Sequence, residues 1–498
     1  MGLVTEDRTR FPQVKKMASP ADLRARLSEL DCDLTVDDSV DPTGPLSTSF
    51  AVDDVAAGPR TVGNRFCILP MEGWDGTTDG APTDLVERRW RRFGAGGAKL
   101  IWGEATAVVA DGRANPNQLV IADSTVDAIG RLRASTVQAH RERFGSADDL
   151  LVGLQLTHSG RWSRPVGQPL ARLTHDHPGL AARTAPGATV FTDAELRDLI
   201  DAYVAAAARA RRAGFDFVDV KHCHGYLLHE LLTAYERPGE FGGTFEGRTR
   251  FFRNVVERIR AEVPDLMVAL RLSVFDFVPF VPGHDRVGQP AAEGSAAHTF
   301  GGDGRGTGVD LTETHALLDL ATELGVGLVS ATAGSPYYNP HIQRPAYFPP
   351  SDGYLPPEDP LVGVTRLLDA TRELQRRHSE LAIVTGAMSY LQDWIAHVGQ
   401  AVIADGSATS IGLGRMALSY PDLPADVLAG KDLDRHLVCR TLSDCTTAPR
   451  NGLISGCYPL DDFYKERPER TQLTLIKRSL RQTPRSLRQT PRSLREGR

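Results

Sequence analysis

The segment Val218–Leu228, with the sequence VDVKHCHGYLL, carries the side chains of this chain that are best suited to acid–base chemistry. Lys221 and His224 can donate hydrogen bonds to an oxygen atom, and Tyr226 is a phenol that can pass a proton. Taken singly, each has a structural explanation, since a tyrosine is usually packed and a histidine near a strand end is usually only hydrogen-bonded. Together they indicate a site that polarises an oxygen and moves a proton.

An apolar run that predicts a β-strand ends at these residues, and it is one of eight such runs. They alternate with longer amphipathic segments, which is typical of βα units around a parallel sheet. Eight repeats predict an α/β fold, the TIM (β/α)8 barrel, in which side chains at the strand ends meet at one mouth. The expected strands cover residues 65–71, 98–105, 150–156, 215–221, 266–272, 325–331, 381–387 and 408–414.

The expected barrel covers residues 61–430, between an N-terminal extension (1–60) and a C-terminal extension (431–476). Helices are predicted at Pro20–Leu30, within 192–214 and within 248–263, where polar starts precede apolar residues at helical spacing. Residues 276–312 are rich in Gly, Asp and Pro and lengthen a loop at the mouth, as a lid or as a surface insertion.

Residues 477–498 repeat the sequence RSLRQTP from Arg478 onward. One leucine per seven residues, together with Pro484 and Pro491, cannot build a coiled coil, so we expect a basic disordered tail.

Composition favours a globular enzyme that acts on small molecules. The 498 residues are 41% hydrophobic and 24% charged, and the net charge of −6 gives no reason to expect nucleic-acid binding. The N-terminus is charged, and no run of about 18 apolar residues occurs, so we expect neither a secretion signal nor a membrane span. Six cysteines are too few for a disulfide scaffold, which fits a cytoplasmic protein. The sequence leaves open whether the chain forms a homo-oligomer.

Several ordered motifs resemble the Old Yellow Enzyme family of NADH:flavin oxidoreductases and 2,4-dienoyl-CoA reductase-like proteins. Members show His-x-x-(His/Asn)-x-Tyr-Leu followed by GG(S/T)-x-E-x-R-x-R-F, and here VDVKHCHGYLL precedes ERPGEFGGTFEGRTRFF. The likeness runs from Asn64 to Asp422 and includes NRFCILPM, LQLTHSGRWSRP, LRLS, VTGAM and IGLGRMALSYPDLP. It implies an FMN-binding barrel, with NAD(P)H as a transient co-substrate.

The resemblance also implies a role for individual residues. Gln155 would meet the flavin pyrimidine edge, and Arg271 would lie by flavin N1 and the C2 carbonyl, where a positive charge stabilises the reduced flavin. The phosphate would lie after the seventh and eighth strands, at Gly386, Ala387, Gly414 and Arg415. The ring itself would be lined by Pro70, Met71, Glu72 and Ala105.

The implied activity is that of an ene-reductase, which reduces an activated C=C bond beside a carbonyl, or forms one in the reverse direction. Lys221 and His224 would polarise the substrate oxygen, and Tyr226 would deliver a proton to the α carbon. The sequence leaves open the direction, the substrate and the choice between NADH and NADPH. Trp74, Tyr337, Tyr338 and the 276–312 loop are expected to shape the substrate site.

Two positions depart from the family pattern. Lys221 stands where a carbonyl-binding histidine is usual, which predicts a more acidic or more polar substrate than a simple enone. Glu72 stands where relatives often carry Thr or Cys near the flavin C4 carbonyl. A carboxylate there would oppose flavin reduction unless it is protonated or paired, and we expect Lys221 to be the partner.

Larger relatives bind an iron–sulfur cluster on C-x2-C-x3-C-x11-C, and only the last spacing recurs here, between Cys445 and Cys457. The first two positions fall on Val438 and Thr441, and Cys439 is out of register by one, so no cluster and no other metal is expected.

Other interpretations remain. GLGRMA (412–417) fits a loose dinucleotide fingerprint, although a second βαβ unit and the expected acidic residue are missing from the sequence pattern. A flavin-free barrel lyase or aldolase could form a Schiff base on Lys221. A non-catalytic barrel that acts through its basic tail is the third alternative.

Overall fold

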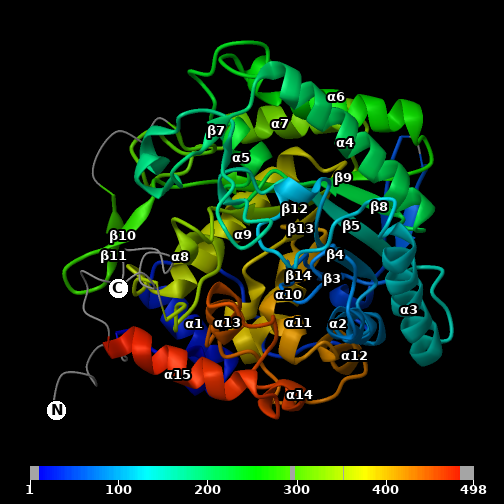
Figure 1. Cartoon of the computed structure of the whole chain (residues 1–498). Helices are drawn as coiled ribbons and strands as arrows, with labels where there is room; N and C mark the ends of the chain where they lie inside the picture. Colours follow the sequence, from blue (N-terminus) through cyan, green and yellow to red (C-terminus); the bar gives the residue numbers. More distant parts are fainter. Residues whose placement is uncertain (1–9, 56, 292–297, 352, 483–498) are drawn as a thin grey trace.

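The computed structural model describes residues 10–55, 57–291, 298–351 and 353–482, and at its centre eight parallel strands close into a barrel (Figure 1). The predicted TIM barrel is therefore confirmed, and each predicted strand overlaps one of the observed strands, four of which extend one to three residues past the predicted end. Around the barrel the order is β12-β13-β14-β3-β4-β5-β8-β9. The strands are β3 (Phe66–Ile68), β4 (Leu100–Ala107), β5 (Leu151–Thr157), β8 (Phe217–Val220), β9 (Met267–Phe275), β12 (Leu328–Ala333), β13 (Ala382–Thr385) and β14 (Ser410–Leu413).

Helices between the strands surround the barrel because each has one apolar face to bury. In α4 (Asp193–Arg212), for example, Leu196, Tyr203 and Ala207 are buried, and the Thr192–Glu195 capping box fixes the first turn. The other large helices of this layer are α2 (Asp84–Ala95), α3 (Val126–Phe144), α6 (Phe245–Glu262), α7 (Thr312–Glu323), α9 (Pro360–Arg377) and α10 (Ile395–Ala404).

The N-terminal extension closes one end of the barrel. Strands β1 (Phe50–Val52) and β2 (Arg60–Val62) form an antiparallel hairpin, and its apolar side chains join the cluster that fills the barrel interior with Trp102 and Phe217. Helix α1 (Pro20–Glu29) lies within one residue of the predicted segment, and its Arg26 bonds Asp359 at the start of α9. The opposite end is left for the loops that follow the barrel strands.

These loops contain short strands and short helices. They are the two-residue strands β6 (Arg172–Leu173) and β7 (Thr189–Val190), the hairpin β10 (Phe280–Pro282) with β11 (Gly288–Pro290), and the short helices α5 (Leu227–Leu231), α8 (Pro340–Gln343), α11 (Arg415–Ser419) and α12 (Leu423–Leu428).

The C-terminal extension folds back onto the barrel through α13 (Asp444–Arg450), α14 (Asp462–Lys465) and α15 (Glu469–Gln482) (Figure 1). Residues 477–482, where the sequence predicts the start of a disordered tail, are therefore helical, and the rest of that tail lies outside the described residues. Within the described ranges, no helix combines the length and apolar character needed to cross a membrane.

Candidate functional site

A cavity of about 490 Å³ opens at the end of the barrel where the carboxyl ends of the strands lie. This volume lies in the range of about 300–1,000 Å³ that is usual for small-molecule sites. Twelve of the thirteen candidate residues line it: Pro70, Met71, Glu72, Gln155, Lys221, His224, Tyr226, Arg271, Gly386, Ala387, Gly414 and Arg415.

Ala105 is the exception, and the expectation that it lines the flavin ring is not met. Ala105 is 1% exposed, and its carbonyl oxygen accepts a hydrogen bond from Gln118 Nε2 at 3.0 Å. The pairing register between β4 and β5 shifts between Gly103 and Ala105, an irregularity that simple alternation along a strand does not foresee.

Tyr226 lies at the centre of a hydrogen-bonded group in the cavity wall. Its Oη lies 2.7 Å from Glu72 Oε2 and 3.0 Å from Tyr337 Oη, and the Lys221 ammonium lies 3.7 Å from the centroid of its ring. The residue is 4% exposed, and burial together with the Glu72 charge raises the pKa of Tyr226 well above its usual value. The phenol is therefore protonated in the resting protein, as a proton donor must be.

Glu72 is half-buried at the edge of the same group, and it is oriented by hydrogen bonds. Asn115 donates to its Oε1 at 3.2 Å, while Tyr226 occupies the other oxygen. Burial raises the pKa of Glu72, and the charge of Lys221 opposes that rise. Among the described residues, Lys221 forms no direct ion pair with Glu72. The two charges therefore interact only by longer-range electrostatic attraction.

His224 reaches the cavity from an unusual backbone conformation. Its φ of 68° lies in the left-handed region, and its main-chain N–H donates to Ser273 Oγ at 3.1 Å. The ring Nε2 lies 3.3 Å from Thr332 Oγ1 and 3.3 Å from Gln343 Nε2. Burial and the nearby Arg271 and Lys221 charges hold the pKa of His224 well below its usual value, so the imidazole is neutral.

Asp219, which sequence reasoning missed, organises the floor of the cavity. Its oxygens accept hydrogen bonds from Gln155 Nε2, from the Trp102 indole at 3.0 Å and from the Arg271 main-chain N–H at 2.7 Å. Burial raises the pKa of this carboxyl to about 6. An acidic residue inside the apolar run FDFVDV was the available signal, since a buried acid needs partners.

Two guanidinium groups in the cavity each have a buried nitrogen atom without a protein partner in the described structure. Arg271 donates through Nη1 to the Pro70 carbonyl at 2.9 Å, but its Nε has no partner. Arg415 donates through Nη2 to the Pro345 carbonyl at 2.7 Å, but its Nη1 has none. Since buried donors are normally satisfied, these atoms indicate a ligand with acceptors at both places.

The backbone beside Arg415 leaves room for such a ligand. A Cβ added to Gly414 would meet nothing nearer than a Leu69 methyl group at 4.0 Å, and Ala387 adopts a left-handed φ of 61° where β13 ends. The first turn of α11 begins at Arg415, although a five-residue helix adds little field of its own. The donor set of Arg271, Gln155 and Arg415 fits the pyrimidine edge and the phosphate of FMN.

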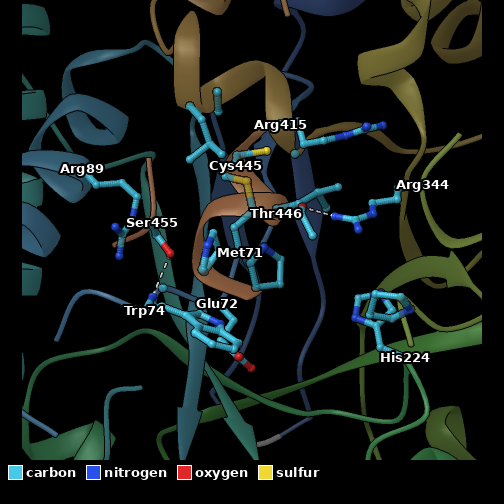
Figure 2. A pocket seen from close by; sticks show the side chains of 18 of the residues that line it. Met71, Glu72, Trp74, Arg89, His224, Arg344, Arg415, Cys445, Thr446 and Ser455 are labelled. Atoms are coloured by element: carbon cyan, nitrogen blue, oxygen red, sulfur yellow. Dashed lines mark hydrogen bonds between the residues drawn. The ribbon is translucent and has the colours of Figure 1, made fainter. Parts of the chain in front are cut away.

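The sequence did not predict the share of the wall that the C-terminal extension supplies. The Trp74 main-chain N–H donates to Ser455 Oγ at 2.8 Å, and Arg344 bonds Thr446 on α13 (Figure 2). The lining residues from this extension are Cys445, Thr446, Pro449, Arg450, Ser455, Gly456, Cys457, Asp461 and Tyr464.

Trp74 and Tyr337 do line the cavity, as predicted for the substrate site, but Tyr338 does not. Tyr338 instead donates a hydrogen bond to Asp276 Oδ2 at 2.5 Å. Tyr337 stacks on Trp162, with ring centroids 4.3 Å apart and planes 6° from parallel. No described residue of 276–312 lines the cavity, so the insertion contributes no wall through those residues.

Cys445 and Cys457 lie in the cavity wall, and Cys439 is buried nearby in the chain. In the described ranges, no three His, Cys, Asp or Glu side chains are grouped so that they could hold a metal ion. The expectation that the chain carries no iron–sulfur cluster stays a prediction for iron analysis.

Comparison with known proteins gives a consistent result. Residues 55–291 match the NADH:flavin oxidoreductase / NADH oxidase family. An NADPH dehydrogenase from Geobacillus sp. strain WCH70 is 33% identical over 227 residues, which cover 44% of this chain and 62% of the relative. An NADPH dehydrogenase from Bacillus subtilis strain 168 is 31% identical over 237 residues, 47% of this chain and 64% of the relative. The chain thus spans less than two thirds of the length of these relatives.

Solved structures support the fold. The Old Yellow Enzyme homologue from Zymomonas mobilis aligns with a TM-score of 0.54 at 23% identity, covering 80% of this chain and 97% of that one. A 2-naphthoyl-CoA reductase in complex with 2-naphthoyl-CoA aligns with a TM-score of 0.64 at 17% identity, covering 86% and 58%. The motif around Tyr226 lies within residues 55–291, the part of the chain that is similar to the NADH:flavin oxidoreductase / NADH oxidase family.

Proposed function

We propose that this protein is an FMN-dependent oxidoreductase that uses NAD(P)H to reduce an activated C=C bond beside a carbonyl group. The observation that carries the proposal is the pair of unsatisfied guanidinium donors, on Arg271 and Arg415, within the cavity that also holds the Tyr226 group. Bound FMN would supply hydride transfer to and from carbon, which the side chains alone cannot perform.

The residues divide this work by their position. Arg271 and Gln155 would hold the flavin pyrimidine edge, with Asp219 fixing the Gln155 amide, while Arg415 and the backbone at Gly386, Ala387 and Gly414 would hold the phosphate. Met71 and Pro70 would lie along the ring.

The substrate would be activated by donors on the opposite wall. His224, as a neutral imidazole, and Lys221 would donate hydrogen bonds to the carbonyl oxygen and so make the β carbon accept hydride. Tyr226 would then give its proton to the α carbon. The cationic Lys221 favours a substrate whose oxygen carries more negative charge than that of a simple enone.

Purified protein tests the proposal directly. It should be yellow, should lose its flavin absorbance on anaerobic addition of NADPH or NADH, and should regain it with an enone, a dienoyl thioester or a cyclic ketone. In Tyr226→Phe the reoxidation step should slow by about 100-fold, within the range of general acid catalysis, and more than the NAD(P)H step slows.

A second function has one observation in its favour: Lys221 is buried, and burial lowers its pKa, as a Schiff-base lysine requires. The lyase or aldolase would be supported if the purified protein is colourless and if borohydride links a carbonyl compound covalently to Lys221. This result would exclude the flavin enzyme.

A further inference from the structure

The hydrogen bond between Glu72 and Tyr226 limits what the phenol can do. Tyr226 Oη carries one hydrogen, and Glu72 Oε2 lies 2.7 Å from it. When Glu72 is a carboxylate it can only accept, so it holds that hydrogen and turns it away from a substrate. In this state Tyr226 offers lone pairs to the cavity rather than a proton.

Protonation of Glu72 reverses the direction of the bond. A carboxylic acid can donate to Tyr226 Oη, and the hydrogen of the phenol is then released toward the cavity. The two protonation states of Glu72 therefore place Tyr226 as an acceptor or as a donor, without any movement of the heavy atoms.

The groups around Glu72 act in opposite directions on its charge. Burial and the Glu104 carboxylate on β4 favour the protonated form, whereas Lys221 after β8 favours the ionised form. The Glu104 charge is itself partly neutralised, because Arg89 and the Trp90 indole bond it. Asn115 and Tyr226 hydrogen-bond the two carboxylate oxygens, and Tyr337 faces the group from the loop after β12.

We propose that Glu72 is the positioning residue that decides whether Tyr226 gives or takes a proton, and that it returns a proton to Tyr226 after each transfer. The proposal rests on the function proposed above. In reduction, the Tyr226 proton forms the new C–H bond at the α carbon, and the hydride from NAD(P)H forms the one at the β carbon. The Glu72 proton then moves to the phenolate, and a proton taken up from bulk solvent restores the carboxylic acid.

The reverse reaction uses the other state. With Glu72 ionised, Tyr226 Oη can take the α proton as its own hydrogen passes to the carboxylate, while the β hydride leaves toward the oxidised acceptor. Low pH therefore favours saturation of the substrate and high pH favours desaturation. The protonation state of Glu72 thus prepares the site for one direction or the other, while the overall equilibrium is set by the reactants and the pH.

Tyr337 is the other group in contact with Tyr226 Oη, but it is a poorer proton source. Burial raises the pKa of this phenol above its usual value, whereas a carboxylic acid is more acidic than a phenol by several units. Proton return from Glu72 to a Tyr226 phenolate is downhill, while return from Tyr337 is close to neutral. Tyr337→Phe is therefore the matched control, since it removes a hydrogen bond to the same atom.

The test compares the holoenzyme with Glu72→Gln, Glu72→Asp and Tyr337→Phe across pH. For reoxidation of the reduced enzyme by an enone, we expect Glu72→Gln to lower the rate by about 10- to 100-fold and to remove one ionisation from the pH profile. Glu72→Asp should restore a titrating profile, and Tyr337→Phe should keep it. An unchanged profile in Glu72→Gln, or loss of the ionisation in Tyr337→Phe alone, overturns the proposal.

Infrared difference spectra of the resting protein give a readout that does not depend on turnover. One component of the protonated carboxyl absorption should titrate in the wild type and in Tyr337→Phe and should be missing in Glu72→Gln, while the components from Asp219 and Asp276 remain in all three proteins. If the absorption is unaffected by Glu72→Gln, the proposal is wrong. A protein without FMN would refute the proposed function instead, and the infrared result would still decide whether Glu72 carries the proton.

Discussion

Buried carboxyl groups in this protein differ in what surrounds them, and the difference separates anchoring from proton transfer. Asp219 receives three hydrogen bonds from protein donors, which hold it in one orientation. Glu72 receives one bond from Asn115 and shares one hydrogen with Tyr226, so its protonation can change at little structural cost. Asp219 therefore acts as an anchor, whereas Glu72 is placed to exchange a proton with Tyr226.

Replacing Asp219 by Asn tests the anchoring role. The Asn amide would have to point its NH2 group at one of three donors, so we expect loss of about 1–3 kcal/mol of stability. Because the Gln155 amide is then no longer fixed, FMN affinity should fall by about 10-fold, since 1.4 kcal/mol corresponds to that factor. Thermal unfolding and FMN titration of the apoprotein measure the two effects.

Asp216→Asn is the matched control. Asp216 lies just before β8, where it accepts a hydrogen bond from the Val152 main-chain N–H and pairs with Arg133. Its loss should lower stability without changing FMN affinity. Equal losses of affinity in both variants would show that Asp219 acts through general stability alone.

Among the elements, the helices after residue 440 matter more for the site than their sequence suggests. The Asp461 carboxylate accepts hydrogen bonds from both terminal nitrogens of Arg88 and from one of Arg92. These bonds connect the loop before α14 to α2. Asp461 is 5% exposed, although Arg88 and Arg92 are about one third exposed, which weakens each pair. The contact holds the C-terminal wall against the cavity.

Asp461→Ala should loosen that wall. We expect a loss of about 1–3 kcal/mol and faster hydrogen exchange in residues 444–465, with unchanged exchange in the barrel strands. Asp462→Ala is the neighbouring control, because Asp462 is exposed and its ion pair within the described part of the chain is with Lys465 alone. Rapid exchange in both variants, or in neither, would contradict the anchoring role of Asp461.

The sequence predicted the barrel and most of the site because both follow local rules. Strand runs such as 215–221 and 266–272 are rich in apolar residues, and residues that follow them must meet at the mouth. The motif alone brought Lys221, His224 and Tyr226 to the cavity correctly. Ala105 does not line the cavity, and the pairing register between β4 and β5 shifts beside it, which the pattern of the sequence does not reveal.

Contacts between segments far apart in the chain could not be predicted. Nothing local in residues 444–464 indicates that they close a cavity begun by Met71 and Trp74, since the contact depends on how the extension folds back. The same holds for Tyr337, whose stacking on Trp162 joins loops from opposite parts of the sequence. Site residues that lie in one motif could be predicted from the sequence, whereas contacts between distant segments could not.

For the molecule as a whole, buried histidines should dominate the response of stability to acid. Burial lowers the pKa of six of them to about 4 or about 3, whereas an unfolded histidine titrates near about 6.5. These residues are His158, His175, His177, His222, His229 and His341. Their contribution is therefore present above about pH 6.5 and is lost as the pH falls toward 4.

Two buried acids act in the opposite direction. Burial raises the pKa of Asp219 and Asp276 to about 6, so their contribution is present below the unfolded value and is lost as the pH rises through 6. Because six histidines oppose two acids, Tm should fall steadily from pH 7 to pH 5. A constant or rising Tm over that interval would show that the histidines are accessible to protons in the folded state.

The central claim is that the mouth of this barrel holds FMN, with Arg271 and Arg415 donating to it. The most direct measurement is the amount of FMN released when the purified protein is denatured. About one FMN per chain is predicted, with uptake weakened when Arg415 is replaced by Ala. A chain that releases no flavin and binds none when FMN is added would contradict the account.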